Sequence, residues 1–222
     1  MKGFSKYWVV LVGCLILHTT TFGQVDFEPN SSVRVSLGLP APLEIATNRP
    51  FKDFLHGLVD LSVGYQYDLD SYYTFGLGGK YVLFNVNEFR NNFGLSGTLH
   101  LFGAYGRVGY ERFWGNLGLD MGVKVGFMNH FSLTNYCKEQ LGRANRTEGG
   151  FVEPNISMSF IVGENENSAF DFFNISYAFH AFRFTPEMVC ADNFPGQTLE
   201  SLDVRTTYLT FGFGYTYFFG RN

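Results

Sequence analysis

The feature that most constrains this chain is a two-residue alternation of large apolar and small or polar side chains. In the clearest block, the odd positions from Leu117 to Phe127 are all apolar, and the even positions between them are Gly, Asp or Lys. Successive side chains of a β-strand point to opposite faces, so this period predicts strands with one apolar and one polar face. After residue 23, apolar runs end well before the about 18 residues that a membrane-spanning helix requires. The sequence therefore predicts an all-β fold.

The alternation recurs in eight blocks, and the segments between them alternate in length. The blocks are Ser32–Leu39, Gly57–Tyr67, Tyr72–Leu83, Phe102–Arg112, Leu117–Met128, Phe151–Val162, Asp171–His180 and Tyr208–Phe219. The short connections are Asp68–Ser71, Phe113–Asn116 and Gly163–Ser168, and the long ones are Pro40–His56, Phe84–Leu101, Asn129–Gly150 and Ala181–Val204. Short turns alternating with long loops around an even number of strands are typical of a bacterial outer-membrane barrel. This pattern predicts an eight-stranded antiparallel up-and-down transmembrane β-barrel, with both termini and the short turns in the periplasm.

A soluble barrel such as a lipocalin also alternates, but its polar face meets water and is dense in Lys and Glu. Here the polar face carries mostly Gly, Ser, Thr and Asn, and charged residues make up only 16% of the chain, against about 25% in soluble domains. Glycines suit the narrow interior of an eight-stranded barrel, where missing side chains make room for a few large ones. We therefore expect the apolar face to contact lipid and the polar face to line the lumen.

The first 23 residues have the organisation of a secretory signal peptide. Lys2 and Lys6 precede the apolar run Tyr7–Leu17, and a cut after Gly23 leaves residues 24–222 as a single barrel domain. An alternative is a lipoprotein signal, because Leu11-Val12-Gly13-Cys14 is similar to a lipobox. The apolar run continues beyond Cys14, which favours the ordinary signal peptide.

The whole mature chain resembles the small eight-stranded outer-membrane barrels of the OmpA and OmpX type, and also the PorT-like barrels of Gram-negative envelopes. The shared features are the signal peptide, the strand count and the aromatic last strand Tyr208–Phe219. The resemblance implies that the barrel-assembly machinery recognises this strand. The tail Gly220-Arg221-Asn222 departs from the family, whose members usually end on the aromatic residue. The resemblance is one of architecture and transfers no reaction, cofactor or binding site.

Charged side chains occupy inward positions in several blocks. Because buried charges must be paired, we interpret them as an ion network that fills the lumen. Within it, Arg107, Glu111 and Asp120 should be neighbours across the turn at Phe113–Asn116. A gate or a proton path is the alternative, but eight strands leave little open pore. The network comprises Arg34, Asp60, Arg107, Glu111, Asp120 and Lys124, with Lys80, Glu153, His180 and Arg205 as further inward residues.

The step His130-Phe131-Ser132 is the one candidate for catalysis. It is similar to the active site of PagL-like lipid A deacylases, in which Ser is the nucleophile, His its base and a Glu orients the base. The acids available here are Glu139 and Glu148. The residues after Ser132 depart from the family's motif, and the alternation places both His130 and Ser132 on the lumen side. We therefore favour a protein that is not an enzyme.

Other ligand classes find little support in the sequence. The histidines have no ligand spacing and the cysteines form no C-x-x-C pair, so we expect neither a metal nor a cofactor. The net charge of −4 weighs against a nucleic-acid partner.

Two cysteines remain in the mature chain. Cys137 and Cys190 fall in the third and fourth long loops, which are predicted to lie outside the cell, where thiols tend to pair. We expect them to form a disulfide that joins the two loops, and two free thiols are the alternative. The predicted function is a structural or interaction role in the envelope, either surface contact or membership of a larger secretion or transport complex. The predicted partners are outer-membrane lipids, the assembly machinery and an envelope protein complex.

Overall fold

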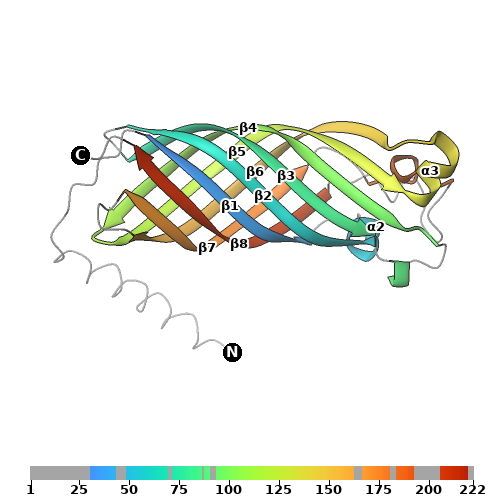
Figure 1. Ribbon diagram of the computed structural model, residues 1–222, viewed down its shortest axis with the longest axis horizontal. Coiled ribbons are helices and arrows are strands. Elements are labelled where there is room, and N and C mark those ends of the chain that lie inside the picture. Colours follow the sequence, from blue (N-terminus) through green and yellow to red (C-terminus); the bar gives the residue numbers. More distant parts are fainter. Residues whose placement is uncertain are drawn as a thin grey trace, which may run out of the picture.

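The computed structural model describes residues 31–43, 49–69, 72–86, 88–90, 94–162, 167–180, 184–192 and 206–219. Within these ranges eight strands, each antiparallel to its neighbours, follow one another around a closed barrel, and β1 pairs with β8 (Figure 1). The strands are β1 (Ser31–Pro42), β2 (Leu55–Asp68), β3 (Tyr73–Val86), β4 (Gly97–Trp114), β5 (Leu117–Thr134), β6 (Asn145–Val162), β7 (Ser168–His180) and β8 (Thr206–Phe219). The predicted eight-stranded up-and-down barrel is confirmed.

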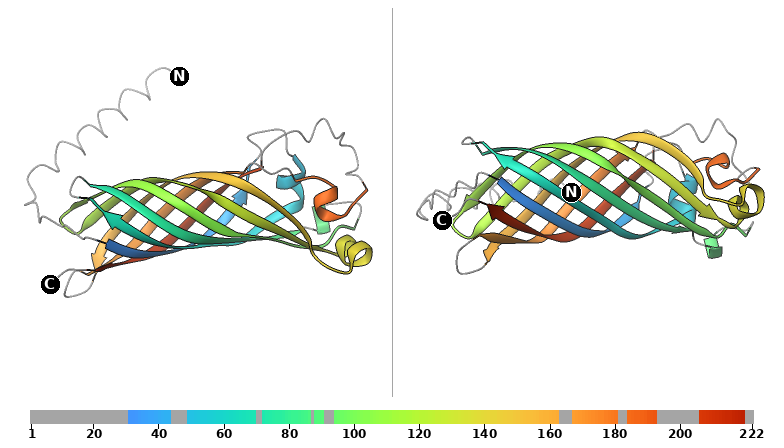
Figure 2. Two further views of the ribbon diagram at one scale, coloured as in Figure 1. Left: turned by 90° about the horizontal axis from the view of Figure 1, so that it is seen from above. Right: turned by 45° about the horizontal axis from the view of Figure 1, so that its top comes forward.

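The two ends of the barrel differ. One end carries the start of β1, the end of β8 and the tight β4–β5 turn, in which Gly115 has a φ of 59° that favours glycine (Figure 1). We call it the turn end. The opposite end, the loop end, carries all the described helices (Figure 2). These are α2 (Arg49–Phe54), η2 (Glu88–Arg90), α3 (Asn135–Leu141) and η3 (Glu187–Val189).

The outer face of the barrel is a belt of apolar side chains. Leu77 is 73% exposed and Phe127 64% exposed, although both are large and apolar. Toward the turn end the belt becomes a girdle of exposed tyrosines, as found where membrane barrels meet the interface. These tyrosines are Tyr65, Tyr67, Tyr72, Tyr73, Tyr215 and Tyr217. The apolar face therefore contacts lipid, as the sequence predicts, and the barrel crosses the membrane.

Inward glycines make room for large side chains in the lumen. A Cβ atom at Gly122 would lie 2.5 Å from the Arg107 guanidinium, and one at Gly78 would lie 2.5 Å from the Tyr105 hydroxyl. Both distances are too short for any real contact. Glycine is thus required at these two inward positions by the large side chains of Arg107 and Tyr105, as expected for a narrow interior.

Two of the predicted long loops contain strand residues at both of their ends, so their predicted bounds were wrong. The segment Phe84–Leu101 contains the end of β3 and the start of β4, and the segment Asn129–Gly150 contains the end of β5, α3 and the start of β6. Near the loop end Val82 and Phe84 point inward while Leu83 points outward, so both faces are apolar and the alternation fades. Beyond Met128, polar residues stand on both faces, with the same effect.

Several predictions concern residues outside the described ranges. The predicted signal peptide 1–23 with Cys14, the predicted inward position of Arg205 and the tail 220–222 all fall there. Within the described ranges, no helix is both long and apolar enough to cross a membrane.

Candidate functional site

The lumen near the turn end holds a group of charged side chains that we call the arginine cluster: Arg34, Arg107, Glu111, Asp120 and Asp171. Arg34 on β1 is its centre. Its Nη2 lies 2.6 Å from Glu111 Oε1, its Nη1 donates to Asp120, and its Nε lies 3.5 Å from Asp171 Oδ2. Arg107 Nη2 donates to both Asp120 oxygens, at 2.6 and 2.7 Å. One carboxylate thus holds two guanidinium groups inside the barrel.

Strand register places the members of the arginine cluster together. In the β4–β5 hairpin Glu111 lies opposite Asp120, and Arg107 lies opposite Lys124, so one inward face carries all four. Arg107 Nη1 also donates to Gln66 Oε1 at 2.7 Å and to Thr74 Oγ1 at 3.0 Å. The structure therefore brings together Arg107, Glu111 and Asp120 across the turn.

A second group, the lysine cluster, lies farther from the turn end and consists of Asp60, Lys80, Lys124 and Glu153. Lys80 Nζ lies 2.9 Å from Asp60 Oδ2 and also donates to Glu153. Lys124 Nζ donates to Glu153 Oε1 at 3.1 Å. Two cations face two carboxylates, so the cluster is neutral as a whole. All four side chains are buried.

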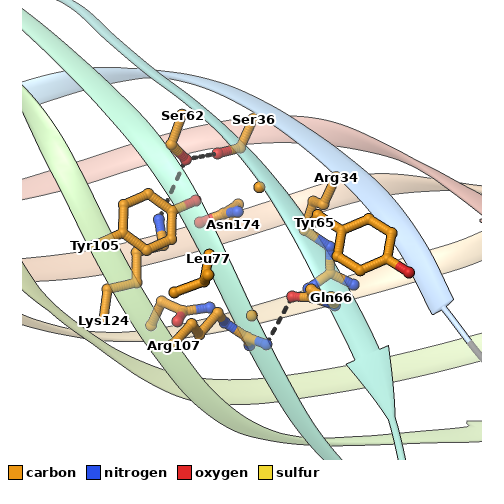
Figure 3. A pocket seen from close by; sticks show the side chains of 13 residues that line it. Arg34, Ser36, Ser62, Tyr65, Gln66, Leu77, Tyr105, Arg107, Lys124 and Asn174 are labelled. Carbon is orange, nitrogen blue, oxygen red and sulfur yellow. Dashed lines mark hydrogen bonds between the residues drawn. The ribbon is translucent and has the colours of Figure 1, made fainter.

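Among the described residues, two small cavities lie beside the ion clusters, and Figure 3 shows the larger of the two. One, of about 20 Å³, lies between Arg34, Arg107 and Lys124, and another, of about 10 Å³, lies beside Asp60 and Glu153. A water molecule needs about 10–15 Å³ of such space. Each cavity is therefore the size of about one water molecule, and neither admits a larger solute.

The loop half of the lumen is filled by aromatic and aliphatic side chains, which we call the apolar plug. Phe51 of α2 packs against Phe84 of β3, with ring centroids 5.3 Å apart, and Phe84 packs in turn on Tyr208 of β8 at 5.4 Å. All three are buried. The other members of the plug are Leu99, Leu101, Met128, Phe184, Met188 and Val189. Sequence reasoning missed this plug, because all of its members except Met128 and Tyr208 lie in segments predicted to be loops.

A disulfide ties the helical parts of the loop end together. Cys137 on α3 and Cys190 after η3 are bonded, with Cα atoms 4.9 Å apart and a sequence separation of 53. The predicted bridge is confirmed. We call α3, η3 and this disulfide the loop-end cap.

Hydrogen bonds anchor the cap to the barrel wall. Thr134, the last residue of β5, accepts from Cys137 N at 3.2 Å and so caps α3, while its hydroxyl donates to Val189 O at 2.9 Å. Asn145 Nδ2, at the start of β6, donates to Glu187 O at 2.7 Å. Two strands and two helical segments thus hold one another in place.

The residues of the enzyme alternative are not brought together as a triad. His130 and Ser132 lie on β5 and are fully buried on the lumen side. Glu148 on β6 lies opposite Asn129, and its side chain is 67% exposed on the outer face. Glu139 is exposed on α3. Since the wall of the barrel separates Glu148 from His130, the geometry does not favour a deacylase.

Among the described residues, no group of three or more His, Cys, Asp or Glu side chains is placed to hold a metal ion. In the two ion clusters, the carboxylates already contact Arg or Lys side chains.

Comparisons with known proteins identify the architecture alone. No protein-family model and no curated protein matches the chain. Neisserial surface protein A is similar in structure, with a TM-score of 0.52 and 10% identity over 86% of this chain and 97% of that one. Ail of Yersinia pestis gives a TM-score of 0.44 at 12% identity, covering 86% of this chain and all of Ail. OprG of Pseudomonas aeruginosa gives 0.44 at 12%, covering 88% of this chain and all of OprG.

The closed barrel, its apolar belt and its tyrosine girdle agree with the likeness to the Neisserial protein. The chain has the fold of the small eight-stranded β-barrels of the outer membrane.

Proposed function

We propose that this protein is exported by its signal peptide and acts in the outer membrane as a non-enzymatic interaction protein. In this proposal the turn end and both termini face the periplasm, the loop end faces outward, and the loop-end cap contacts a partner in the envelope or at the cell surface.

The filled lumen is the observation that carries the proposal. Among the described residues, two ion clusters and the apolar plug occupy it, and the cavities beside the clusters measure about 20 and 10 Å³. A solute pathway and a lumenal active site both require space that these side chains take up. What the protein offers to other molecules is therefore its outer surface.

The cap is the part of that surface best suited to binding. It is held by a disulfide and by side-chain bonds from β5 and β6, so little conformational entropy remains to be lost on association. Its helix α3 exposes Lys138, Glu139 and Leu141. Loops and short helices held on a rigid scaffold are where binding residues concentrate.

Crosslinking in intact outer membranes, followed by purification, tests the proposal. We expect a stoichiometric partner with the native protein and its loss with Leu141→Asp, which places a charge on the exposed face of α3. Asn116→Asp, in the turn at the other end, is the matched control and should retain the partner. Recovery without any partner, or equal recovery with Leu141→Asp, would contradict the proposed role of the cap.

The orientation has its own test, based on labelling with a membrane-impermeant maleimide. Arg143→Cys, just after α3, should react in intact cells. Asn116→Cys, in the β4–β5 turn, should react only after the outer membrane has been permeabilised. The reverse pattern would show that the loop end faces the periplasm.

The enzyme alternative is tested separately. Because Ser132 is buried in the lumen, we expect overproduction of the protein to leave the acylation of lipid A unchanged, and Ser132→Ala to make no difference. Loss of an acyl chain on overproduction, abolished by Ser132→Ala, would establish the deacylase.

A further inference from the structure

An apolar groove runs over the outer face of β5, β6 and β7, in the part of the belt nearest the loop end. Its volume is about 630 Å³, and it opens outward to the surrounding lipid. Its sides are formed by large exposed residues, of which Phe127 is 64% and Val125 55% exposed. Val152 and Phe179 continue the lining on β6 and β7.

The groove owes its depth to Gly150, which points outward between these side chains. A Cβ atom at Gly150 would meet only Gly126 O at 3.7 Å and the Phe127 ring at 3.8 Å, both ordinary contacts. By contrast, a Cβ atom at the inward Gly126 would lie 2.2 Å from Ala104 O. The barrel thus requires glycine at position 126 but would accept a side chain at 150, where its absence leaves the groove open.

Polar residues begin immediately beyond the groove, toward the loop end. Asn129, two residues or about 7 Å along the strand from Phe127, lies opposite Glu148. The Arg146 side chain, 61% exposed, reaches toward this level: its guanidinium donates to Asn129 Oδ1 at 2.5 and 3.1 Å and lies 3.9 Å from Glu148. A change from Phe127 to these polar residues is typical of the level at which hydrocarbon gives way to lipid headgroups, and the Arg146 guanidinium also lies 5.8 Å from the ring centroid of the outward Phe131.

We propose that the groove holds one acyl chain of a phosphate-bearing membrane lipid, whose phosphate contacts Arg146. The occupant is an acyl chain because the groove lies in the lipid-facing belt, and its lining is apolar. The phosphate follows from charge complementarity, since guanidinium groups bind phosphate oxygens well. The guanidinium of Arg146 lies just beyond the groove toward the loop end. Glu148 beside it accepts a hydrogen bond from a donor elsewhere in the headgroup. The protein thereby selects one lipid from the ring of lipids around the barrel.

Native mass spectrometry of the detergent-purified protein tests the groove, with dipalmitoylphosphatidylethanolamine as the probe. We expect the native protein to retain one lipid and Gly150→Leu to bind it about tenfold more weakly, since the leucine occupies the groove. Gly79→Leu is the matched control, because Gly79 also faces lipid and a Cβ there meets only Gly103 O at 3.7 Å. Equal binding by the native protein and Gly150→Leu, or equal losses in both variants, would mean that only non-selective lipid surrounds the barrel.

A second binding comparison tests the contact between Arg146 and the headgroup phosphate. The native protein should bind the phosphatidylethanolamine about tenfold more tightly than dipalmitoylglycerol, which has the same chains and no phosphate. In Arg146→Gln that preference should disappear. As a control for folding, the unboiled variant should migrate faster on gels than the boiled variant, which shows that its barrel is closed. A preference that survives Arg146→Gln would overturn the assignment of the phosphate to Arg146.

Discussion

The two halves of the lumen are filled by opposite kinds of chemistry. Near the turn end, buried Arg, Lys, Asp and Glu side chains pair with one another across the barrel. Near the loop end, aromatic and aliphatic side chains from the strands, from α2 and from the segment around η3 form one apolar cluster. The same wall of eight strands therefore encloses an ionic interior and an apolar one, stacked along one axis.

The difference follows from what each half must pack against. In the ionic half, side chains of the strands alone fill the space. Long charged side chains reach across it, and inward glycines leave room for them. In the loop half Phe51 of α2 and Phe184, Met188 and Val189 of the last loop segment enter the same cluster. Apolar packing suits this half, because chain segments from outside the wall can be held there without an exact pattern of partners.

The largest effect is expected in the ionic half, from Arg34→Met. The substitution leaves Glu111, Asp120 and Asp171 buried without their shared cation, and breaking a buried pair in this way costs about 3–5 kcal/mol. Denaturant unfolding in detergent micelles measures the loss. Arg146→Met, at an exposed arginine on the outer face, should stay within about 1 kcal/mol. Equal losses would show that the cluster does not hold the turn half together.

The apolar half should respond to loss of volume and not to loss of charge. Phe84→Ala removes a ring that contacts both Phe51 and Tyr208, and we expect it to lower the free energy of unfolding by about 3–4 kcal/mol. The same unfolding assay applies. Phe75→Ala on the lipid-facing side, where the residue is 50% exposed, should cost clearly less. A larger loss at Phe75 would mean that the inner and outer faces have been exchanged.

A charge on the outside should be costly, whereas the same residue type is tolerated inside when it is paired. Val123→Arg places a guanidinium in the middle of the lipid-facing side of β5, with an expected cost of about 2–4 kcal/mol. Gly122→Arg should fail for another reason, crowding against Arg107. Folding into lipid vesicles of different thickness distinguishes the two variants. We expect Val123→Arg to fold better in thinner bilayers and Gly122→Arg to show no such dependence. Identical dependence on bilayer thickness would contradict this distinction.

The smallest effect on the barrel should come from the disulfide. Because the loop-end cap can open while the strands stay paired, Cys137→Ser combined with Cys190→Ser should lower the free energy of barrel unfolding by about 2 kcal/mol or less. Limited proteolysis should nevertheless cut α3 or η3 faster than in the native protein. Unchanged proteolysis would show that the side chains of Thr134 and Asn145 hold the cap without the bridge.

Much of the ionic half of the barrel could be predicted from the sequence, whereas Asp171, which precedes a register shift in β7, and most of the apolar half could not. From Leu117 to Phe127 one face is apolar and the other carries glycine or charged residues. The two-residue period, the two faces and the lumenal position of Asp120 and Lys124 can therefore all be predicted. Near the loop end Val82 and Phe84 alternate with Tyr81 and Leu83. A strand that is apolar on both faces has no alternation to detect, and β3 was consequently predicted to end at Leu83.

A second limit applies where the strands leave the membrane. On the outer face of β5, Asn129 interrupts the apolar residues, which resume at Phe131 and Leu133 before the strand ends at Thr134. The sequence rule that identifies membrane strands relies on an unbroken apolar face, so it ended this strand at Met128. The disulfide between Cys137 and Cys190 was predictable because it depends only on the topology of the loops and on the redox compartment.

The central claim, that one face of each strand lines a filled lumen while the other meets lipid, is tested most directly by a spin-label scan of β5. Labels placed one at a time at positions 119 to 125 in the bilayer-embedded protein report their accessibility to molecular oxygen, which concentrates in hydrocarbon. We expect maxima at positions 119, 121, 123 and 125 and minima at the three positions between them. Maxima at 120, 122 and 124, or no alternation at all, would contradict it.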